Sequence, residues 1–254
     1  MCSPGDGSRS ALSLPKLLLF AALSGVGLGA AGNAVNDLQD IVADRVNAPD
    51  HHPLASGRLP AQASHLVIWF GIVLGIGAAA LVSGQLVLVA LLALVVMLGY
   101  SPLLKRYGVP GNIAVAVVGG LPLFYGALAM GRPGEGIVPW VLAASLQLSR
   151  ELVKDLGDEA GDRAAGRRTL PVRVGLARAT RMASWACVTI FPLALVLPLT
   201  SGYGSVYLDV ASLSLFAVAV AVLAIRRQRF VTASGLLKVA MVFGLGALVL
   251  GRVV

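Results

Sequence analysis

Two groups of acidic residues hold most of the chemistry that this sequence offers. In the first group, Asp37, Asp40 and Asp44 follow Asn36 directly after an apolar run. If that run continues as a helix, the three aspartates are spaced i, i+3 and i+7 and share one face. Carboxylates next to hydrocarbon are costly to place, so their presence indicates a functional site.

The second group shows the same regularity. Glu151, Asp155, Asp158 and Asp162 are spaced i, i+4, i+7 and i+11, which is again one helical face. Carboxylates at these spacings repel one another unless they share a cation. Oxygen ligands suit Mg²⁺, which keeps several waters and completes its shell with substrate phosphates. The alternative is that each group is only the solvated end of a helix.

Basic residues interleave with the acidic ones and favour a phosphate-bearing substrate. Arg163, Arg167 and Arg168 follow the second group, and Lys105 and Arg106 end the segment YSPLLKR. Arg offers phosphate oxygens a planar fork, and Lys offers a point charge. Two Mg²⁺ ions on a diphosphate, with these cations on the remaining oxygens, would stabilise a pyrophosphate leaving group. A single Arg at a helix end is more often a topology signal.

The composition requires membrane helices to position these groups. The chain has 254 residues, of which 57% are hydrophobic and 13% are charged, and its mean hydropathy is +0.84. About a quarter of the residues are charged in an average soluble chain. We expect an all-α transmembrane bundle in one domain over 12–254, after a polar tail over 1–11, because an apolar run of about 20 residues crosses the bilayer as a helix. Eight spans are predicted, at about 12–35, 64–83, 85–103, 111–130, 137–153, 181–200, 206–225 and 235–252.

The net charge of +8 is divided by membrane side and does not indicate a nucleic-acid partner. Sixteen of the 20 Lys and Arg residues fall on alternate connections between the predicted spans, hence on one side. The positive-inside rule makes that side cytoplasmic. Nine of the 12 acidic residues lie there too, within two connections. Both acidic groups are therefore expected at the cytoplasmic face.

The motifs resemble those of a known family. NDxxDxxxD at 36–44, followed by Asn47, Pro49 and Pro53, looks like the first signature of the UbiA superfamily of intramembrane prenyltransferases. DxxDxxxD at 155–162, followed by Gly166 and the sequence TLP, looks like the second signature. YSPLLK at 100–105 resembles the Tyr-and-Lys segment that lies between them. The resemblance extends from about residue 14 to the C-terminus.

The resemblance implies a helical bundle around a central cavity and an Mg²⁺-dependent reaction. A polyprenyl diphosphate ionises to an allylic cation, which a lipophilic acceptor captures. The resemblance also implies residue roles, with His51 and His52 expected near the cavity mouth. The implied metal ligands are Asp37, Asp40, Asp44, Asp155, Asp158 and Asp162; Asn36, Arg58 and Arg167 help to bind the metal and diphosphate; and the catalytic residues are Tyr100, Lys105, Arg163 and Arg168.

The acceptor is harder to predict. Segment 150–171 resembles the ether-lipid branch of the family and also its homogentisate and chlorophyll branches. The ether-lipid resemblance implies geranylgeranyl transfer from geranylgeranyl diphosphate to geranylgeranylglyceryl phosphate in a prokaryotic cell membrane. The alternative is an aromatic acceptor of the quinone or chlorophyll type. A secondary transporter is a remote alternative, because intramembrane acidic residues also mark ion pathways.

One feature departs from the family pattern. Family members usually have nine spans, with one complete helix ahead of the helix that bears the first motif. Here only one span precedes Asn36. We expect either that an upstream helix is missing from this sequence or that the chain is an eight-span variant. Arg9 and Lys16 favour the first option, because eight spans would place these basic residues on the outer side.

Overall fold

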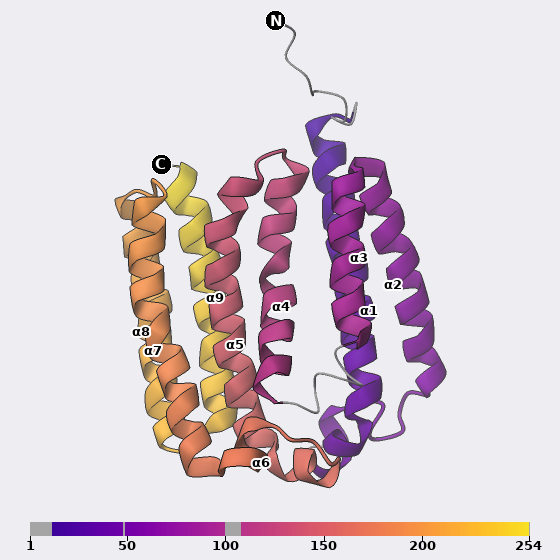
Figure 1. Ribbon diagram of the computed structural model, residues 1–254, viewed down its shortest axis with the longest axis vertical. Helices are drawn as coiled ribbons and strands as arrows, with labels where there is room; N and C mark the ends of the chain where they lie inside the picture. The colour runs from indigo at the N-terminus through magenta and orange to yellow at the C-terminus, as the bar shows by residue number, and fades with distance from the viewer. Residues whose placement is uncertain (1–11, 48, 100–107, 254) are drawn as a thin grey trace, which may run out of the picture.

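The fold is a bundle of helices that run side by side, seen in a computed structural model that describes residues 12–47, 49–99 and 108–253. These described residues contain no strand, so the predicted all-α fold is confirmed. The start of α1 and the end of α9 lie at one end of the bundle, and α6 lies across the other end (Figure 1). The helices are α1 Leu14–Asn47, η1 Pro49–His51, α2 Ala61–Val82, α3 Gly84–Gly99, α4 Val109–Ala129, α5 Pro133–Ala164, α6 Leu170–Val174, α7 Leu176–Thr200, α8 Ser205–Arg226 and α9 Phe230–Val253.

Each of the eight predicted spans corresponds to one long helix of the bundle. Six of these, α1, α2, α4, α7, α8 and α9, are long and apolar enough to cross a membrane. Helix α3 is apolar but has only 16 residues, and α5 continues beyond its apolar part into the second acidic group. Large apolar side chains such as Trp69, Phe70 and Phe216 point outward. The chain is therefore an integral, multi-pass membrane protein.

The division between the second and third spans was predicted correctly. Helix α2 ends at Val82, and Ser83 has an extended backbone. Helix α3 begins at once with Gly84. The Ser83 hydroxyl accepts a hydrogen bond from the Leu86 N–H at 3.2 Å, which satisfies one of the free donors at the start of the helix. Two helices joined by a tight turn result.

Small residues bring the helices close together on the α1 side of the bundle. A Cβ atom on Gly27 would lie 2.7 Å from the carbonyl oxygen of Gly71, so α1 and α2 can pack this closely only because both residues are glycine. The Ser24 hydroxyl donates to the Gly75 carbonyl oxygen at 2.7 Å and lies 2.7 Å from the Tyr125 hydroxyl. Ser24 thereby links α1, α2 and α4.

The second close approach positions the two acidic helices. A Cβ atom on Gly161 of α5 would lie 2.5 Å from the carbonyl oxygen of Ala43 on α1. Beside it, Asn47 accepts a hydrogen bond from the Gly161 N–H through Oδ1 at 2.9 Å. Both acidic groups lie on helices that continue past their apolar parts, as predicted. The ends of α1 and α5 are thus fixed against each other.

Candidate active site

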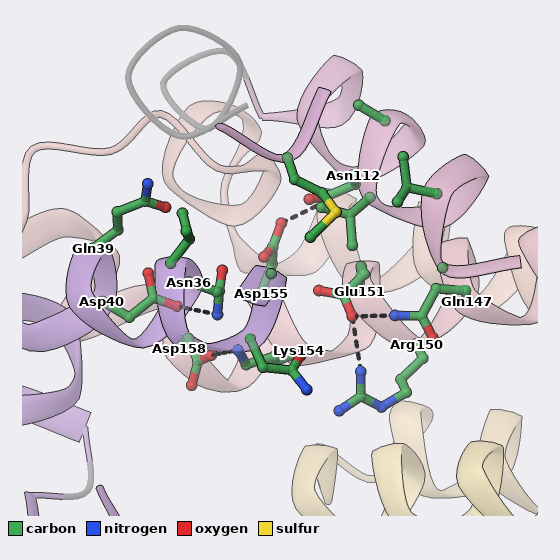
Figure 2. A pocket seen from close by; sticks show the side chains of 18 of the residues that line it. Asn36, Gln39, Asp40, Asn112, Gln147, Arg150, Glu151, Lys154, Asp155 and Asp158 are labelled. Atoms are coloured by element: carbon green, nitrogen blue, oxygen red, sulfur yellow. Dashed lines mark hydrogen bonds and ion pairs between the residues drawn. The ribbon is translucent and has the colours of Figure 1, made fainter. Parts of the chain in front are cut away.

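A cavity of about 410 Å³ opens between the ends of the two acidic helices. Its walls come from α1, α3, α4 and α5, together with Thr169 at the start of α6. Apolar residues such as Val96, Met97 and Val118 line one part of it. Carboxylates, amides and cations line the other part, as the close view in Figure 2 shows. The cavity can hold an amphiphile with a charged head and an apolar chain.

The α1 wall presents Asn36, Asp40 and Asp44 to the cavity, but not Asp37. Asp37 is exposed on the outside of the helix. Helical spacing alone does not explain this, because residues advance by about 100° each, which puts Asp37 only about 20° from Asp44 around the helix. Of the three predicted aspartates, Asp40 and Asp44 line the cavity and Asp37 does not.

The α5 wall carries the second acidic group as predicted. Asp155, Asp158 and Asp162 all line the cavity. Lys154 Nζ lies 4.0 Å from Asp158 Oδ2. The same face, followed toward the membrane interior, adds Glu151 together with Gln147 and Arg150. The carboxylates of α1 and α5 thus meet in one space, although about 115 residues separate their motifs in the sequence.

Asp155 is partly buried on α5 and contacts Asn112 of α4. Burial raises its pKa to about 7, and a hydrogen bond from Asn112 Nδ2 at 2.7 Å works in the opposite direction by stabilising the charge. Burial also raises the pKa of Asp158, and Lys154 opposes that rise. A bound cation would stabilise the ionised form of both groups.

Arg167 joins the two acidic groups directly. Its Nη2 donates to Asp40 Oδ1 at 2.5 Å and to the Gln39 carbonyl oxygen at 2.9 Å, and its Nη1 donates to Asp162 Oδ1 at 3.0 Å. Burial alone would lower the pKa of the guanidinium, but Asp40 and Asp162 raise it. The second oxygen of Asp40 accepts from Asn36 Nδ2 at 2.9 Å. One buried cation therefore bridges an aspartate of each motif.

Several predicted site residues lie elsewhere. Arg58 is exposed and donates to the Asp50 carbonyl oxygen at 2.5 Å. Arg163 is exposed and pairs with Glu159 at 2.7 Å, and Arg168 is exposed as well. None of the three arginines lines the cavity. Arg163 is on the outer face of α5, Arg58 lies between η1 and α2, and Arg168 lies between α5 and α6. Tyr100 and Lys105 lie outside the described residues.

The two loop histidines divide between the site and its surroundings. His52 Nδ1 lies 3.1 Å from Asp44 Oδ2, so this ring contacts a cavity carboxylate. His51 is exposed at the end of η1. Neither ring lines the cavity itself. The placement of His52 agrees with the expectation of a residue near the cavity mouth.

The donor set is suited to Mg²⁺, although no three His, Cys, Asp or Glu side chains come together as a metal site within the part of the chain described. Mg²⁺ needs only one or two carboxylates when waters and substrate phosphates complete its shell. Asp44, Asp155 and Asp158 line an open cavity and supply hard oxygen ligands. The residues present therefore fit Mg²⁺ bound together with a phosphate substrate.

The sequence prediction missed the polar residues deeper on α5 and the amide on α4. Gln147, Arg150 and Lys154 line the cavity, and so does Asn112. Helical periodicity could have indicated the first three, because 147, 150, 154 and 158 continue the same face at steps of three and four residues. The contact of Asn112 with Asp155 depends on how α4 packs on α5.

Comparisons with known proteins agree with this architecture. Residues 7–244 match the UbiA prenyltransferase family. The chain is 35% identical over 246 residues to a digeranylgeranylglyceryl phosphate synthase from Thermococcus gammatolerans, covering 93% of this chain and 87% of that protein. It is 43% identical over 153 residues to a protein of the same name from Halobacterium salinarum, covering 59% of this chain and 54% of that protein.

A solved structure shows the same fold. The structure of a UbiA homolog from Archaeoglobus fulgidus bound to GPP and Mg²⁺ aligns with a TM-score of 0.69 and 20% identity, covering 96% of this chain and 91% of that chain. The family match spans most of the sequence, and the two facing acidic groups agree with it. The chain belongs to the UbiA prenyltransferase family and is an integral membrane prenyltransferase.

Proposed function

We propose that this enzyme transfers a geranylgeranyl group from geranylgeranyl diphosphate to geranylgeranylglyceryl phosphate in an Mg²⁺-dependent reaction. The observation that carries the proposal is the cavity in which carboxylates of α1 and α5 face each other beside an apolar wall. The acceptor is supported by the relatives named digeranylgeranylglyceryl phosphate synthase. Mg²⁺ is supported by the donor set and by the Archaeoglobus homolog bound to GPP and Mg²⁺.

In this proposal each polar residue of the cavity has a defined task. Asp44, Asp155 and Asp158 hold Mg²⁺, and Asp40 and Asp162 complete the acidic lining from their places beside Arg167. Bound Mg²⁺ supplies positive charge that neutralises the diphosphate as it leaves. Lys154 and Arg167 are the cavity cations close enough to these carboxylates to contact diphosphate oxygens as well. Lys105 and Tyr100 stay predicted contacts from the sequence.

The apolar part of the cavity excludes water from the allylic cation. Met97, Val115 and Val118 come from α3 and α4 and line the same cavity as the carboxylates. The cation therefore meets the acceptor hydroxyl before it meets a water molecule. The acceptor oxygen forms a bond to the terminal prenyl carbon, the bond from that carbon to the diphosphate breaks, and the acceptor loses its hydroxyl proton.

The proposal also assigns the site to the cytoplasmic side of a prokaryotic membrane. The ends of α1 and α5 lie at the same end of the bundle as α6 and the connection between α8 and α9 (Figure 1). That connection carries Arg226, Arg227 and Arg229. Basic residues concentrate on the cytoplasmic side of membrane proteins.

The test is transfer of labelled geranylgeranyl diphosphate by the purified protein in liposomes with Mg²⁺. We expect a labelled ether product with geranylgeranylglyceryl phosphate, no product with EDTA, and a loss of at least about 100-fold in Asp158→Asn, because even residues that only orient metal ligands cost 10–100-fold. Glu159→Gln is the matched control, since the neighbouring residue lies outside the cavity. Transfer to an aromatic acceptor instead would replace the proposed acceptor, and full activity of Asp158→Asn would refute the site.

A further inference from the structure

Two buried polar atoms of the cavity wall have no hydrogen-bond partner. Within the described residues, only Arg150 Nε and Thr169 Oγ1 are buried side-chain nitrogen or oxygen atoms without a partner. Both residues line the catalytic cavity. Leaving a buried donor unpaired is costly, and the cost is greater when the group is charged. Two such atoms in one cavity indicate that a bound molecule supplies the missing acceptors.

Arg150 is held in place by its neighbours on α5. Glu151 Oε1 accepts from Arg150 Nη1 at 2.8 Å and from Gln147 Nε2 at 2.8 Å (Figure 2). The ion pair fixes one nitrogen of the guanidinium and leaves Nε unpaired. Arg150 lies eight residues before Asp158, or about 12 Å deeper along the helix. An arginine at this depth is costly and indicates a functional role.

Thr169 is held at the opposite end of the cavity by a close backbone contact. Gly108, with φ of +70°, packs so tightly that a Cβ atom there would lie 2.6 Å from the Arg168 carbonyl oxygen and 3.5 Å from the Thr169 Cα. Thr169 is 4% exposed. Thr169 follows Arg167 by two residues, and Arg167 pairs with Asp40 and Asp162. We therefore assign the Thr169 hydroxyl to the proposed diphosphate, which leaves Arg150 as the unpaired group that the prenyl diphosphate does not explain.

A second, more apolar cavity adjoins the catalytic cavity at Gln147, which lies on α5 three residues before Arg150. It has a volume of about 250 Å³, lies between α4, α5, α7, α8 and α9, and shares Gly119, Pro122 and Gln147 with the catalytic cavity. The hydroxyls that face it are already paired, since Tyr207 donates to the Ala194 carbonyl oxygen and Ser214 donates to the Ala240 carbonyl oxygen, both at 2.7 Å. This apolar chamber offers a bound molecule little except hydrocarbon contact.

We propose that Arg150 and the apolar chamber together form the subsite of the acceptor. Arg150 binds the phosphate monoester of an amphiphile, and the chamber holds the start of its isoprenoid tail. The inference rests on the proposed function and names the residue that selects a phosphate-bearing acceptor. The two substrates occupy different ends of the polar wall, because the diphosphate is drawn to the Mg²⁺-binding carboxylates, of which Asp155 and Asp158 lie about 8 and 12 Å beyond Arg150 along α5.

The test for Arg150 is equilibrium binding to the full-length protein in lipid nanodiscs, with EDTA present so that no transfer takes place. The probes are geranylgeranylglyceryl phosphate and its dephosphorylated alcohol, geranylgeranylglycerol. Arg150→Gln should weaken binding of the phosphate by about 10- to 100-fold, as expected for hydrogen bonds to a charged group, and leave binding of the alcohol unchanged. Arg150→Lys should lose less, because it keeps the charge and a partner for Glu151. Arg226→Gln, at the exposed end of α8, is the control.

The test for the chamber uses two glycines of α9. A Cβ atom on Gly244 would meet Ser214 Oγ at 3.5 Å and Leu146 Cδ1 at 3.7 Å, which are ordinary contacts, and Gly244 lines the chamber. Gly244→Leu should raise the KM for the acceptor at least tenfold and change the KM for geranylgeranyl diphosphate less than twofold. Gly246→Leu, the same change two residues away and outside the chamber lining, should change neither constant.

Three results would overturn the subsite. Binding of geranylgeranylglyceryl phosphate that is unchanged in Arg150→Gln removes the phosphate contact. An equal loss for geranylgeranyl diphosphate binding with Mg²⁺ makes Arg150 a residue of the donor site. A larger effect of Gly244→Leu on the donor assigns the chamber to the donor chain. If the wild-type protein binds the phosphate through Arg150 but transfers no prenyl group to it, the proposed function fails and the subsite stands.

Discussion

Arg167 provides the sharpest test of how the two acidic helices are held together. Its guanidinium is 11% exposed, and the carboxylates that it bridges, Asp40 and Asp162, are 6% and 4% exposed. Arg167→Gln leaves both carboxylates buried without their cation. Breaking a buried pair in this way costs about 3–5 kcal/mol. At about 2–4 °C per kcal/mol for a chain of this size, the apparent melting temperature should fall by about 6–20 °C.

The assay is thermal unfolding of the purified protein in detergent with EDTA, at a fixed heating rate. Arg163→Gln is the control, because Arg163 is 65% exposed and pairs with Glu159 at the surface. A surface pair contributes about 0–1 kcal/mol, so this variant should melt within about 4 °C of the wild type. Combining Arg167→Gln with Asp40→Asn and Asp162→Asn should recover most of the loss, because the unpaired charges are then gone.

Melting measured with added Mg²⁺ provides a second test of the same contact. The carboxylates that lose Arg167 in this variant line the cavity, so added Mg²⁺ should raise the melting temperature of Arg167→Gln more than that of the wild type. The reasoning is refuted if Arg167→Gln and Arg163→Gln melt at the same temperature. It is also refuted if neutralising Asp40 and Asp162 lowers the stability of the Arg167 variant further.

Three further predictions follow from the same geometry. Burial raises the pKa of Asp155 to about 7 from about 4 in an unfolded chain, so the folded state loses stability as the pH rises through that interval. In EDTA at pH 8, Asp155→Asn should therefore raise the free energy of unfolding by at most about 4 kcal/mol and raise the melting temperature accordingly. At pH 4 the melting temperature should be unchanged. A lower melting temperature at pH 8 would contradict this. Gly161→Ala should destabilise the protein by about 1–3 kcal/mol or more, because the added Cβ atom would meet the Ala43 carbonyl oxygen at 2.5 Å. Gly157→Ala is the control and should melt like the wild type, because the nearest contact of its Cβ atom would be at 3.5 Å. Asn112→Ala should weaken Mg²⁺ binding by about 10–100-fold, as expected for a residue that orients a metal ligand. The affinity is measured by electron paramagnetic resonance with Mn²⁺ as the probe in place of Mg²⁺, and an unchanged Mn²⁺ affinity would refute that role.

Hydropathy was sufficient to predict the helices, because each span must satisfy its own backbone hydrogen bonds in lipid. The distribution of Lys and Arg along the sequence also placed the two acidic groups on one membrane side, since positive charge marks that side. The extension of α1 and α5 beyond their apolar parts was predicted from spacing alone. The sequence therefore indicated both halves of the site and the fact that they meet.

Spacing could not decide which member of each group faces inward. Asp37, Asp40 and Asp44 fit one broad face equally well, and only the packing of α1 on α2 and α5 turns Asp37 outward. The same limit applies to the cations, because Arg163 and Arg167 both follow the second acidic group, yet only Arg167 turns back between the helices. A contact across 127 residues of sequence depends on tertiary packing, which local patterns do not encode.

The most direct test of the central claim compares two aspartates on the same helix. Asp37 and Asp44 both belong to the first motif, but only Asp44 lines the cavity. Single-turnover transfer from geranylgeranyl diphosphate to geranylgeranylglyceryl phosphate, measured across an Mg²⁺ titration, should fall at least about 100-fold in Asp44→Asn. It should stay within about threefold of the wild type in Asp37→Asn, because Asp37 faces away from the cavity. Equal losses in the two variants, or a larger loss in Asp37→Asn, would contradict a site built between the facing sides of α1 and α5.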